Sequence, residues 1–203
     1  EPSGLYCLAA RRGSHRQHRP AFFMRQLQFQ ERQILTPPTF PPTIPATEYP
    51  ARWAKVQALM DRLDLDYLAA YADDRAAFGP AHARWLANFP VHFEPACVLL
   101  AREGPPVMLV GPESDQYALL VGQIADVRVL RELTHPDEDY PFAKIQSLAE
   151  SIASLGRGRP AVKRVGLGGR GLIGADLLRA FQAALPEVIQ VRGARICPPV
   201  IVL

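Results

Sequence analysis

Apolar residues occur in short runs along most of the chain, separated by polar residues, prolines and glycines. Six of these runs have the length and the β-branched or aromatic content of buried strands. Gly104 and Pro105 separate the second run from the third, which predicts a tight antiparallel hairpin. The six predicted strands are Asp66–Tyr71, Ala96–Ala101, Val107–Val110, Asp126–Leu130, Lys163–Leu167 and Val188–Val191.

Between these runs, several segments show helical spacing. The segment from about Tyr49 to Leu63 carries apolar residues three or four positions apart, which form one face of a helix. We expect Thr47 or a residue near it to cap this helix, and Pro50 to lie in its first turn. The other predicted helices are one that ends at a corner around Asn88, Asp115–Ile124 behind a Ser114 cap, Pro141–Leu155 and Ile173–Leu185.

Six strands interleaved with about five helices predict an α/β domain. Because the hairpin requires an antiparallel pair, whereas strands joined through helices are commonly parallel, we expect a mixed six-stranded sheet with helices on both faces. Six prolines between Thr36 and Pro50 favour an extended segment before the domain. The predicted organisation is therefore a basic and then proline-rich arm over 1–47, extended or disordered, a domain over 48–192, and a tail over 193–203.

Charge and composition narrow the class of partner. The 203 residues carry a net charge of +3, but five of the 23 Lys and Arg lie in the first 25 residues, with one of the 20 acids. The rest, 18 basic against 19 acidic residues, is close to neutral and offers no basic groove for nucleic acid. No apolar run approaches the roughly 20 residues that span a bilayer. We therefore expect no nucleic-acid partner and no membrane.

The three cysteines are Cys7, Cys97 and Cys197, widely spaced and without a C-x-x-C pair. This pattern argues against a disulfide framework and against a zinc cluster. Cys97 lies inside an apolar strand, so we interpret it as a buried small hydrophobe rather than a nucleophile. A protein of this composition is expected to be soluble and cytoplasmic.

The glycine-rich segment Gly166–Gly171 follows a predicted strand, precedes a predicted helix and fits the pattern G-x-G-x-x-G. Such glycines let the backbone approach the pyrophosphate of a dinucleotide at a helix amino terminus. However, Gln190, Val191 and Arg192 stand at the end of the next strand, where a dinucleotide site has an acid. A plain glycine-rich turn and a nucleotide-binding module are thus both open.

Two acidic segments resemble metal sites at first sight. Asp137, Glu138 and Asp139 lie beside His135, and Asp73 is followed by Asp74. Consecutive residues of one loop do not easily converge on a single cation. We therefore interpret both segments as solvated loops and expect no metal site in this chain.

The loop after the corner is richer in functional groups, with Phe89, His92, Phe93 and Glu94 in close succession. An imidazole between aromatic rings can contact a small substrate or an adjacent subunit. The alternative is a packed loop with a satisfied histidine. No G-x-S-x-G, H-E-x-x-H or P-loop motif is present, so residue types alone indicate no catalytic apparatus.

The order of these features resembles the amino-terminal domain of the creatinase, prolidase and aminopeptidase P family. The resemblance covers about Glu48–Val191 and rests on Arg52 near the start of the first helix, followed by four short motifs. These are Asp-Tyr-Leu-Ala-Ala, Trp-Leu-Ala-Asn-Phe, Gly-Pro-Pro in the hairpin and Val-Gly-Leu-Gly-Gly. The family's corner usually reads Tyr-Leu-Thr-Gly-Phe, so Asn88 stands at the position of its glycine. Because Asn tolerates the left-handed conformation, we expect the turn to be kept.

The resemblance implies a fold with ribonuclease H-like layering and a non-catalytic role. Members of the family join such a domain to a larger "pita-bread" domain, in which two Asp, one His and two Glu hold two divalent ions such as Mn or Zn. It therefore implies no cofactor and no activity in this chain alone, and a parent that is a metal-dependent X-Pro peptidase or creatinase-like hydrolase.

The resemblance also implies partners. They are a second copy, in a homodimer, or the pita-bread domain, whose active site this domain would cover. By position, Phe89, His92 and Phe93 are implicated in substrate contacts towards a neighbouring subunit. The alternatives from other classes are the nucleotide-binding module of residues 166–171 and an interaction module that uses the proline-rich arm.

Overall fold

The computed structural model describes residues 44–155, 164–185 and the backbone of 188–191. Nearly all of the predicted arm and the whole of the predicted tail lie outside these residues. The helices are α2 (Glu48–Leu63), α3 (Ala81–Ala87), α4 (Asp115–Val121), α5 (Leu148–Leu155), α6 (Ala175–Ala184) and the 3₁₀ helix η1 (Arg131–Leu133). The strands are β1 (Tyr67–Ala72), β2 (Ala96–Ala101), β3 (Val107–Val110), β4 (Val127–Leu130), β5 (Ile145–Gln146), β6 (Val165–Gly168) and β7 (Val188–Val191).

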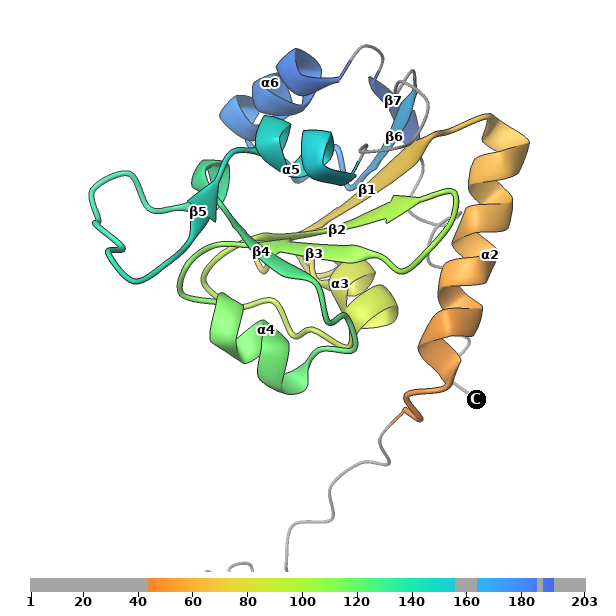
Figure 1. Ribbon diagram of the computed structural model, residues 1–203, viewed down its shortest axis with the longest axis horizontal. Helices are drawn as coiled ribbons and strands as arrows, with labels where there is room; N and C mark the ends of the chain where they lie inside the picture. Colours follow the sequence, from red (N-terminus) through yellow and green to blue (C-terminus); the bar gives the residue numbers. More distant parts are fainter. Residues whose placement is uncertain (1–43, 156–163, 186–187, 192–203) are drawn as a thin grey trace, which may run out of the picture. The chain divides into compact units, whose positions relative to one another are not determined.

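The strands form one mixed sheet in the order β5-β4-β3-β2-β1-β6-β7 (Figure 1). Strand β2 runs antiparallel to both of its neighbours, β1 and β3, while every other described pairing is parallel. All six predicted strands are present, and the predicted hairpin joins β2 to β3, with Gly104 at φ 84°. The predicted α/β fold with a mixed sheet is confirmed.

The prediction of a helix over Pro141–Leu155 was wrong in its first half. Residues Ile145–Gln146 instead form a seventh strand at the sheet edge, and α5 begins only at Leu148. The reason is a capping box: the Glu150 N–H donates to Ser147 Oγ over 3.1 Å, and the Ser147 N–H donates to the Glu150 carboxylate over 2.6 Å. This reciprocal pair sets the start of the helix at Ser147.

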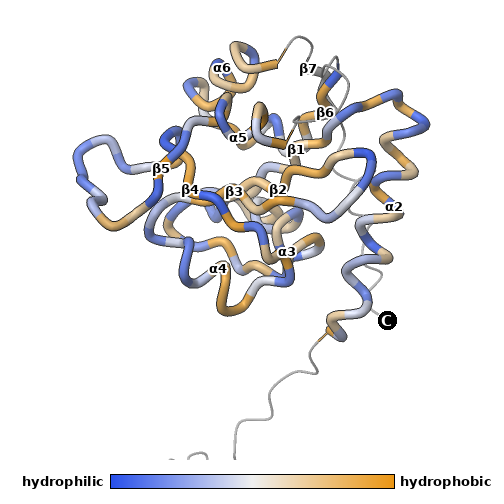
Figure 2. Tube along the Cα trace, viewed as in Figure 1, coloured by the Kyte–Doolittle hydropathy of each residue, from blue (hydrophilic) through white to orange (hydrophobic). Residues whose placement is uncertain are grey.

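Helices cover both faces of the sheet (Figure 1). Alternate residues of β1 point to opposite sides: Leu68 and Ala70 join a core with α2, α3 and α4, while Tyr67 and Ala69 join a core with α5 and α6. Every residue of β1, β2 and β3 is buried, which agrees with the hydrophobic colouring of these strands in Figure 2. Strands buried on both faces read as continuous apolar runs, and this is the pattern that predicted them.

Asn88 ends α3 in the left-handed conformation, at φ 56° and ψ 21°. Its N–H donates to Arg84 O over 3.1 Å, and the Phe89 N–H donates to Ala83 O over 3.2 Å. These bonds close the last turn of the helix in the manner usually provided by glycine. The expectation that Asn88 keeps the turn is confirmed.

The last carbonyls of α3 are bound by groups from other elements. A helix leaves its final carbonyls without partners inside the helix, and here three successive ones receive donors from α2 and from the segment after α4. The pairs are Arg52 Nη1 to Trp85 O at 2.9 Å, Trp53 Nε1 to Leu86 O at 2.8 Å, and Gln123 N to Ala87 O at 2.8 Å. The corner is therefore held from two sides.

No helix in the described part of the chain is long and apolar enough to cross a membrane.

Replacing Gly169 by Ala is expected to lower the free energy of unfolding by about 2 kcal/mol or more. Gly169 has φ +79°, and an added Cβ would lie 2.6 Å from the backbone oxygen of Tyr71. Gly171→Ala is the matched control, because its Cβ would meet nothing within 4 Å, and its effect should stay within about 0.5 kcal/mol. Urea unfolding of the two variants measures the difference; equal effects would contradict the packing described here.

Candidate functional site

The candidate site lies at one end of the strands, where several loops meet. Strands β1, β3 and β6 run in the same direction, so their carboxyl ends all lie on this side of the sheet. The segment that leads into the antiparallel strand β2 arrives on the same side. In open α/β sheets, ligands bind outside the carboxyl ends of the strands.

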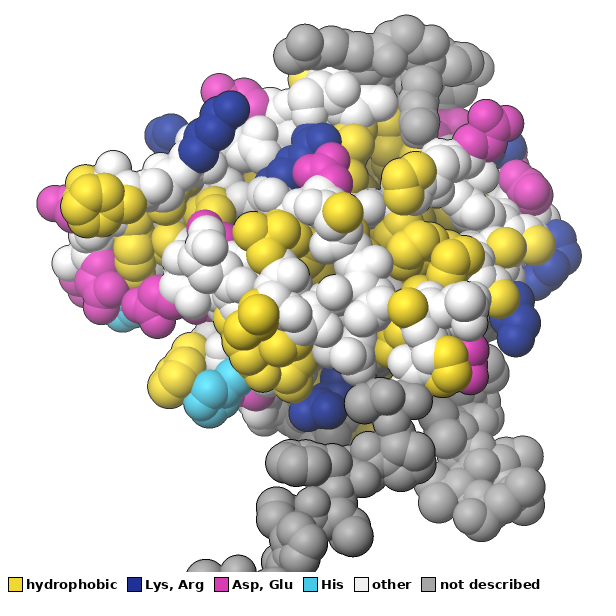
Figure 3. Space-filling view, turned by 60° about the horizontal axis from the view of Figure 1, so that its bottom comes forward, with side chains coloured by type: hydrophobic (Ala, Val, Ile, Leu, Met, Phe, Trp, Pro, Cys, Tyr) yellow, Lys and Arg dark blue, Asp and Glu magenta, His cyan; other side chains and the backbone are white. Residues whose placement is uncertain are grey.

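A cleft of about 610 Å³ opens here between the segment that leads into β2 and the segment that joins β3 to α4. Figure 3 looks onto the face carried by α3 and α4, where hydrophobic side chains gather and a histidine lies beside them at the lower edge. Clefts of this size accommodate small ligands or peptide side chains. The lining residues are Arg84, Pro90, Val91, His92, Phe93, Glu113, Ser114 and Tyr117.

Two of the three predicted contact residues, His92 and Phe93, lie together on the surface. Their ring centroids are 3.9 Å apart, and the Phe93 residue is 79% exposed. Phe93 has φ 63°, and the Glu94 N–H donates to His92 O over 2.8 Å, which closes a three-residue turn around it. A bulky residue at positive φ is a strained outlier. We call this pair the His92–Phe93 tip.

The third predicted contact residue, Phe89, lies elsewhere. It is only 1% exposed and belongs to the core on the α2, α3 and α4 side of the sheet. Its ring centroid is 5.8 Å from that of Tyr117, a residue that lines the cleft. Phe89 therefore packs in the core beneath the cleft-lining Tyr117, and in this conformation it is not available to a ligand.

Glu94 fixes the other end of the loop, a role that sequence reasoning missed. Its carboxylate accepts the Glu113 N–H over 3.1 Å, at the amino terminus of α4, and it is also hydrogen-bonded to Ser114. Ser114 was expected to cap α4, but its side chain makes no capping bond to the helix; instead, Glu94 binds the N–H of Glu113, 19 residues away, just before the helix begins. Thr47, at the start of α2, likewise makes no side-chain capping bond.

Burial raises the pKa of Glu94, while the hydrogen bonds that it accepts from the Glu113 N–H and from the hydroxyl and N–H of Ser114 oppose this shift. Glu94 is 9% exposed. Gly111 lies so close to its carboxylate that a Cβ added to the glycine would be 2.2 Å from Glu94 Cδ. The glycine thus makes room for the carboxylate. Nothing in a single sequence links residues 94, 111 and 114.

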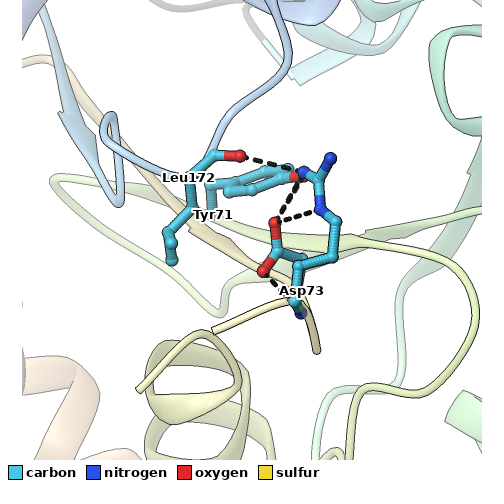
Figure 4. Close-up of polar contacts among 4 residues, drawn as sticks. Tyr71, Asp73 and Leu172 are labelled. Carbon is cyan, nitrogen blue, oxygen red and sulfur yellow. Dashed lines mark hydrogen bonds and ion pairs between the residues drawn. The ribbon is translucent and has the colours of Figure 1, made fainter. Parts of the chain in front are cut away.

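The interpretation of Asp73 as a solvated loop residue was wrong. Asp73 is 3% exposed and accepts three hydrogen bonds from Arg75, through its N–H at 3.1 Å, Nε at 3.0 Å and Nη2 at 2.7 Å (Figure 4). Arg75 Nη2 also donates to Leu172 O over 2.9 Å. Burial, followed by the charge of Asp73, raises the pKa of Tyr71 to about 12. This network ties the loop after β1 to the turn after β6.

Asp74 is also more than a solvated residue. Its Oδ2 accepts the Phe93 N–H over 3.2 Å and lies 3.6 Å from His92 Nδ1. The segment Asp73–Asp74 therefore has two roles, one directed into the domain and one towards the His92–Phe93 tip. The two aspartates are adjacent in sequence, but their partners are brought to them only by the fold.

The glycine-rich segment does not have the geometry of a phosphate-binding loop. Gly166 and Gly168 lie inside β6, where they are paired with β1 and β7, and α6 starts only at Ala175. The glycines of a dinucleotide site form the turn itself. The structure agrees with a glycine-rich turn, in which Gly169 lies against the backbone of Tyr71.

The remaining candidates also have structural interpretations. Cys97 is buried, and burial raises the pKa of its thiol to about 12, so it is not a nucleophile. His135 and the acids of residues 137–139 are exposed, as expected for a solvated loop. Within the described ranges, no three His, Cys, Asp or Glu side chains are grouped so that they could hold a metal ion.

Solved peptidase structures are similar to this chain. Aminopeptidase P from Streptococcus thermophilus is 12% identical, with a TM-score of 0.48 over 73% of this chain and 95% of that chain. The N-terminal domain of the cytoplasmic peptidase PepQ from Mycobacterium tuberculosis is 15% identical, with a TM-score of 0.48 over 72% of this chain and 95% of that chain. The chain spans only 34% of the Xaa-Pro dipeptidase from Bacillus anthracis, at 13% identity and a TM-score of 0.46 over 73% of this chain.

No protein-family model and no curated protein matches the sequence. The similar structures are of the kind that the sequence resembles. At identities of 12–15% and TM-scores below 0.5, they decide neither the family nor the activity of this chain.

Replacing Glu94 by Gln removes one titrating group from the loop. Because the folded-state pKa of Glu94 is raised, its protonated form favours folding below the ordinary value of 4.5, and this contribution is lost as the pH rises through the folded-state value. The free energy of unfolding of the native chain, minus that of Glu94→Gln, should therefore fall as the pH rises above 4.5. Urea unfolding at several pH values measures it. A difference that rises over this range would contradict the burial of the carboxylate.

Proposed function

We propose that the domain is a non-catalytic part of a metal-dependent hydrolase of the X-Pro peptidase or creatinase-like kind, in which it mediates oligomerisation and covers an active site. The metal-binding residues of such an enzyme belong to its catalytic domain, and this chain supplies the covering surface. Its partner is a second copy of the protein or a catalytic domain on which it docks. We expect the protein to be cytoplasmic.

The observation that carries this proposal is the His92–Phe93 tip. The Phe93 backbone adopts a conformation that costs of order 1–3 kcal/mol, and its ring is 79% exposed, so this cost buries almost no apolar surface of the domain. Backbone strain of this kind persists where the surrounding structure enforces it, often at functional sites. A contact with another molecule would use the exposed rings.

The position of the tip supports the same proposal. It follows the Asn88 corner directly, and the sequence resemblance places substrate contacts towards a neighbouring subunit in this loop. The cleft beside it contains a cation, Arg84, an acid, Glu113, and the half-exposed ring of Tyr117. Such a surface offers charged and aromatic groups to a peptide held by another domain.

The 203-residue chain alone, supplied with Mn²⁺ and X-Pro dipeptides, is expected to release no free proline. The sequence resemblance assigns the metal ligands to a separate domain, so the chain should lack the activated water that the hydrolysis needs. Chromatography of the dipeptides after long incubation measures the release. Turnover that depends on added metal and scales with protein concentration would overturn the non-catalytic assignment.

Benzoylphenylalanine, a photo-crosslinking residue introduced at position 93 of the protein expressed in its source organism, is expected to crosslink to a neighbouring subunit. Phe93 is exposed at the tip, where the proposed contact lies. Position 142 is the matched control, because Phe142 is at least as exposed as Phe93 but lies on the loop before β5 rather than in the cleft. Mass spectrometry identifies the products. Crosslinks between subunits that are no more frequent from 93 than from 142 would contradict the proposal.

A further inference from the structure

We propose that Asp74 is the positioning residue of the His92–Phe93 tip. It holds the strained turn in place and turns the outer nitrogen of His92 towards a ligand group that donates a hydrogen bond. The purpose of this arrangement rests on the proposed function, whereas its geometry does not.

One oxygen of Asp74 serves both residues of the tip. Oδ2 accepts the Phe93 N–H over 3.2 Å, and the same atom is 3.6 Å from His92 Nδ1, too far for a hydrogen bond but close enough for the negative charge to act on the ring. The Phe93 N–H belongs to the residue with the strained φ of 63°. A hydrogen bond to a charged acceptor is stronger than one to a neutral acceptor, so Asp74 is placed to offset the strain.

Asp74 can do this because its own backbone is held. The preceding residue, Asp73, is buried and donates its N–H to Gly79 O over 3.2 Å. The following residue, Arg75, donates its N–H to Asp73 Oδ1 over 3.1 Å and reaches Leu172 O over 2.9 Å with its side chain (Figure 4). Asp74 therefore projects from a segment that is anchored on both sides.

The carboxylate of Asp74 also influences which nitrogen of the His92 ring carries the proton. Nδ1 faces a negatively charged oxygen that only accepts, so, of the two neutral tautomers of the ring, the one with the proton on Nδ1 is favoured. The other ring nitrogen, Nε2, then presents a lone pair away from Asp74. The His92 side chain is 68% exposed, so this lone pair is accessible to an N–H group of a peptide or to an amine. The complementary ligand chemistry is a hydrogen-bond donor beside an apolar group that packs on Phe93.

The experiment compares Asp74→Ala, Asp74→Asn and the control Asp139→Ala in the 203-residue chain. Asp139 is an exposed acid of the solvated loop, so its replacement removes the same charge away from the tip. Two NMR readouts are used: hydrogen exchange of the Phe93 N–H, and the ¹⁵N shifts of the neutral His92 ring, which report its tautomer. Asp74→Asn keeps an oxygen that can accept the Phe93 N–H but lacks the charge.

Asp74→Ala should speed exchange of the Phe93 N–H roughly tenfold, as expected for loss of a charged acceptor. It should also move the His92 tautomer away from the Nδ1–H form. Asp74→Asn should give exchange between that of the native chain and that of Asp74→Ala, because a neutral acceptor remains, and Asp139→Ala should change neither readout. The inference is overturned if Asp74→Ala leaves both readouts unchanged, or if Asp139→Ala changes them equally.

The two proposals can fail separately. The NMR readouts report the tip within one chain, so they do not depend on any partner. If Asp74→Ala disturbs the tip but benzoylphenylalanine at position 93 gives no crosslink to a neighbour, Asp74 is a positioning residue and the proposed contact is wrong. If the crosslink forms equally well with Asp74→Ala and the NMR readouts are unchanged, the contact stands and the role given to Asp74 is wrong.

Discussion

The carboxyl end of α3 is the constraint on which the described site depends. A helix of seven residues has few internal hydrogen bonds, and most of its carbonyls need partners from outside. Arg52 and Trp53 supply two donors from α2, Gln123 supplies one from the segment after α4, and Asn88 closes the turn. Three helices are thereby tied to one corner, and the loop that carries the His92–Phe93 tip starts from that fixed point. Arg52 also packs against the rings of Tyr49 and Trp85, so its charge is held between aromatic faces.

From that corner the loop is held by two acids. Glu94 binds the amino terminus of α4, and Asp74 binds the turn at Phe93. Both acids act on backbone N–H groups, while Phe89 and Val91 anchor the first part of the loop in the core. The rings of His92 and Phe93 are therefore not needed to pack the domain, and they are available for contact with another molecule.

Much of the fold could be predicted from the sequence, because buried strands and amphipathic helices leave local patterns. The hairpin at Gly104, the six main strands and the left-handed Asn88 were all accessible in this way. The start of α5 was also encoded locally, in the capping box Ser147 and Glu150, but that signal was missed. The roles of Asp74 and Glu94 had no local signal, because their partners are 19 residues away and meet them only at the carboxyl edge of the sheet. For the same reason Phe89, one position from the corner, could not be told apart from the exposed Phe93 by sequence alone.

The arrangement of the sheet has a consequence for how the domain assembles. Strands β2 and β3 meet through a tight hairpin, whereas β1 and β6 are joined at their starts by Asp66 and Arg164, which are 98 positions apart and exchange hydrogen bonds of 2.9 Å. Closing so long a stretch of chain costs more entropy than closing a hairpin, and distant pairings slow folding. We expect β6, α6 and β7 to join the sheet after the hairpin has formed, and to be the first elements to separate from the sheet in partial unfolding. The loop after β1, which is bound to the turn after β6 through Arg75, would then gain its final order only at that late step.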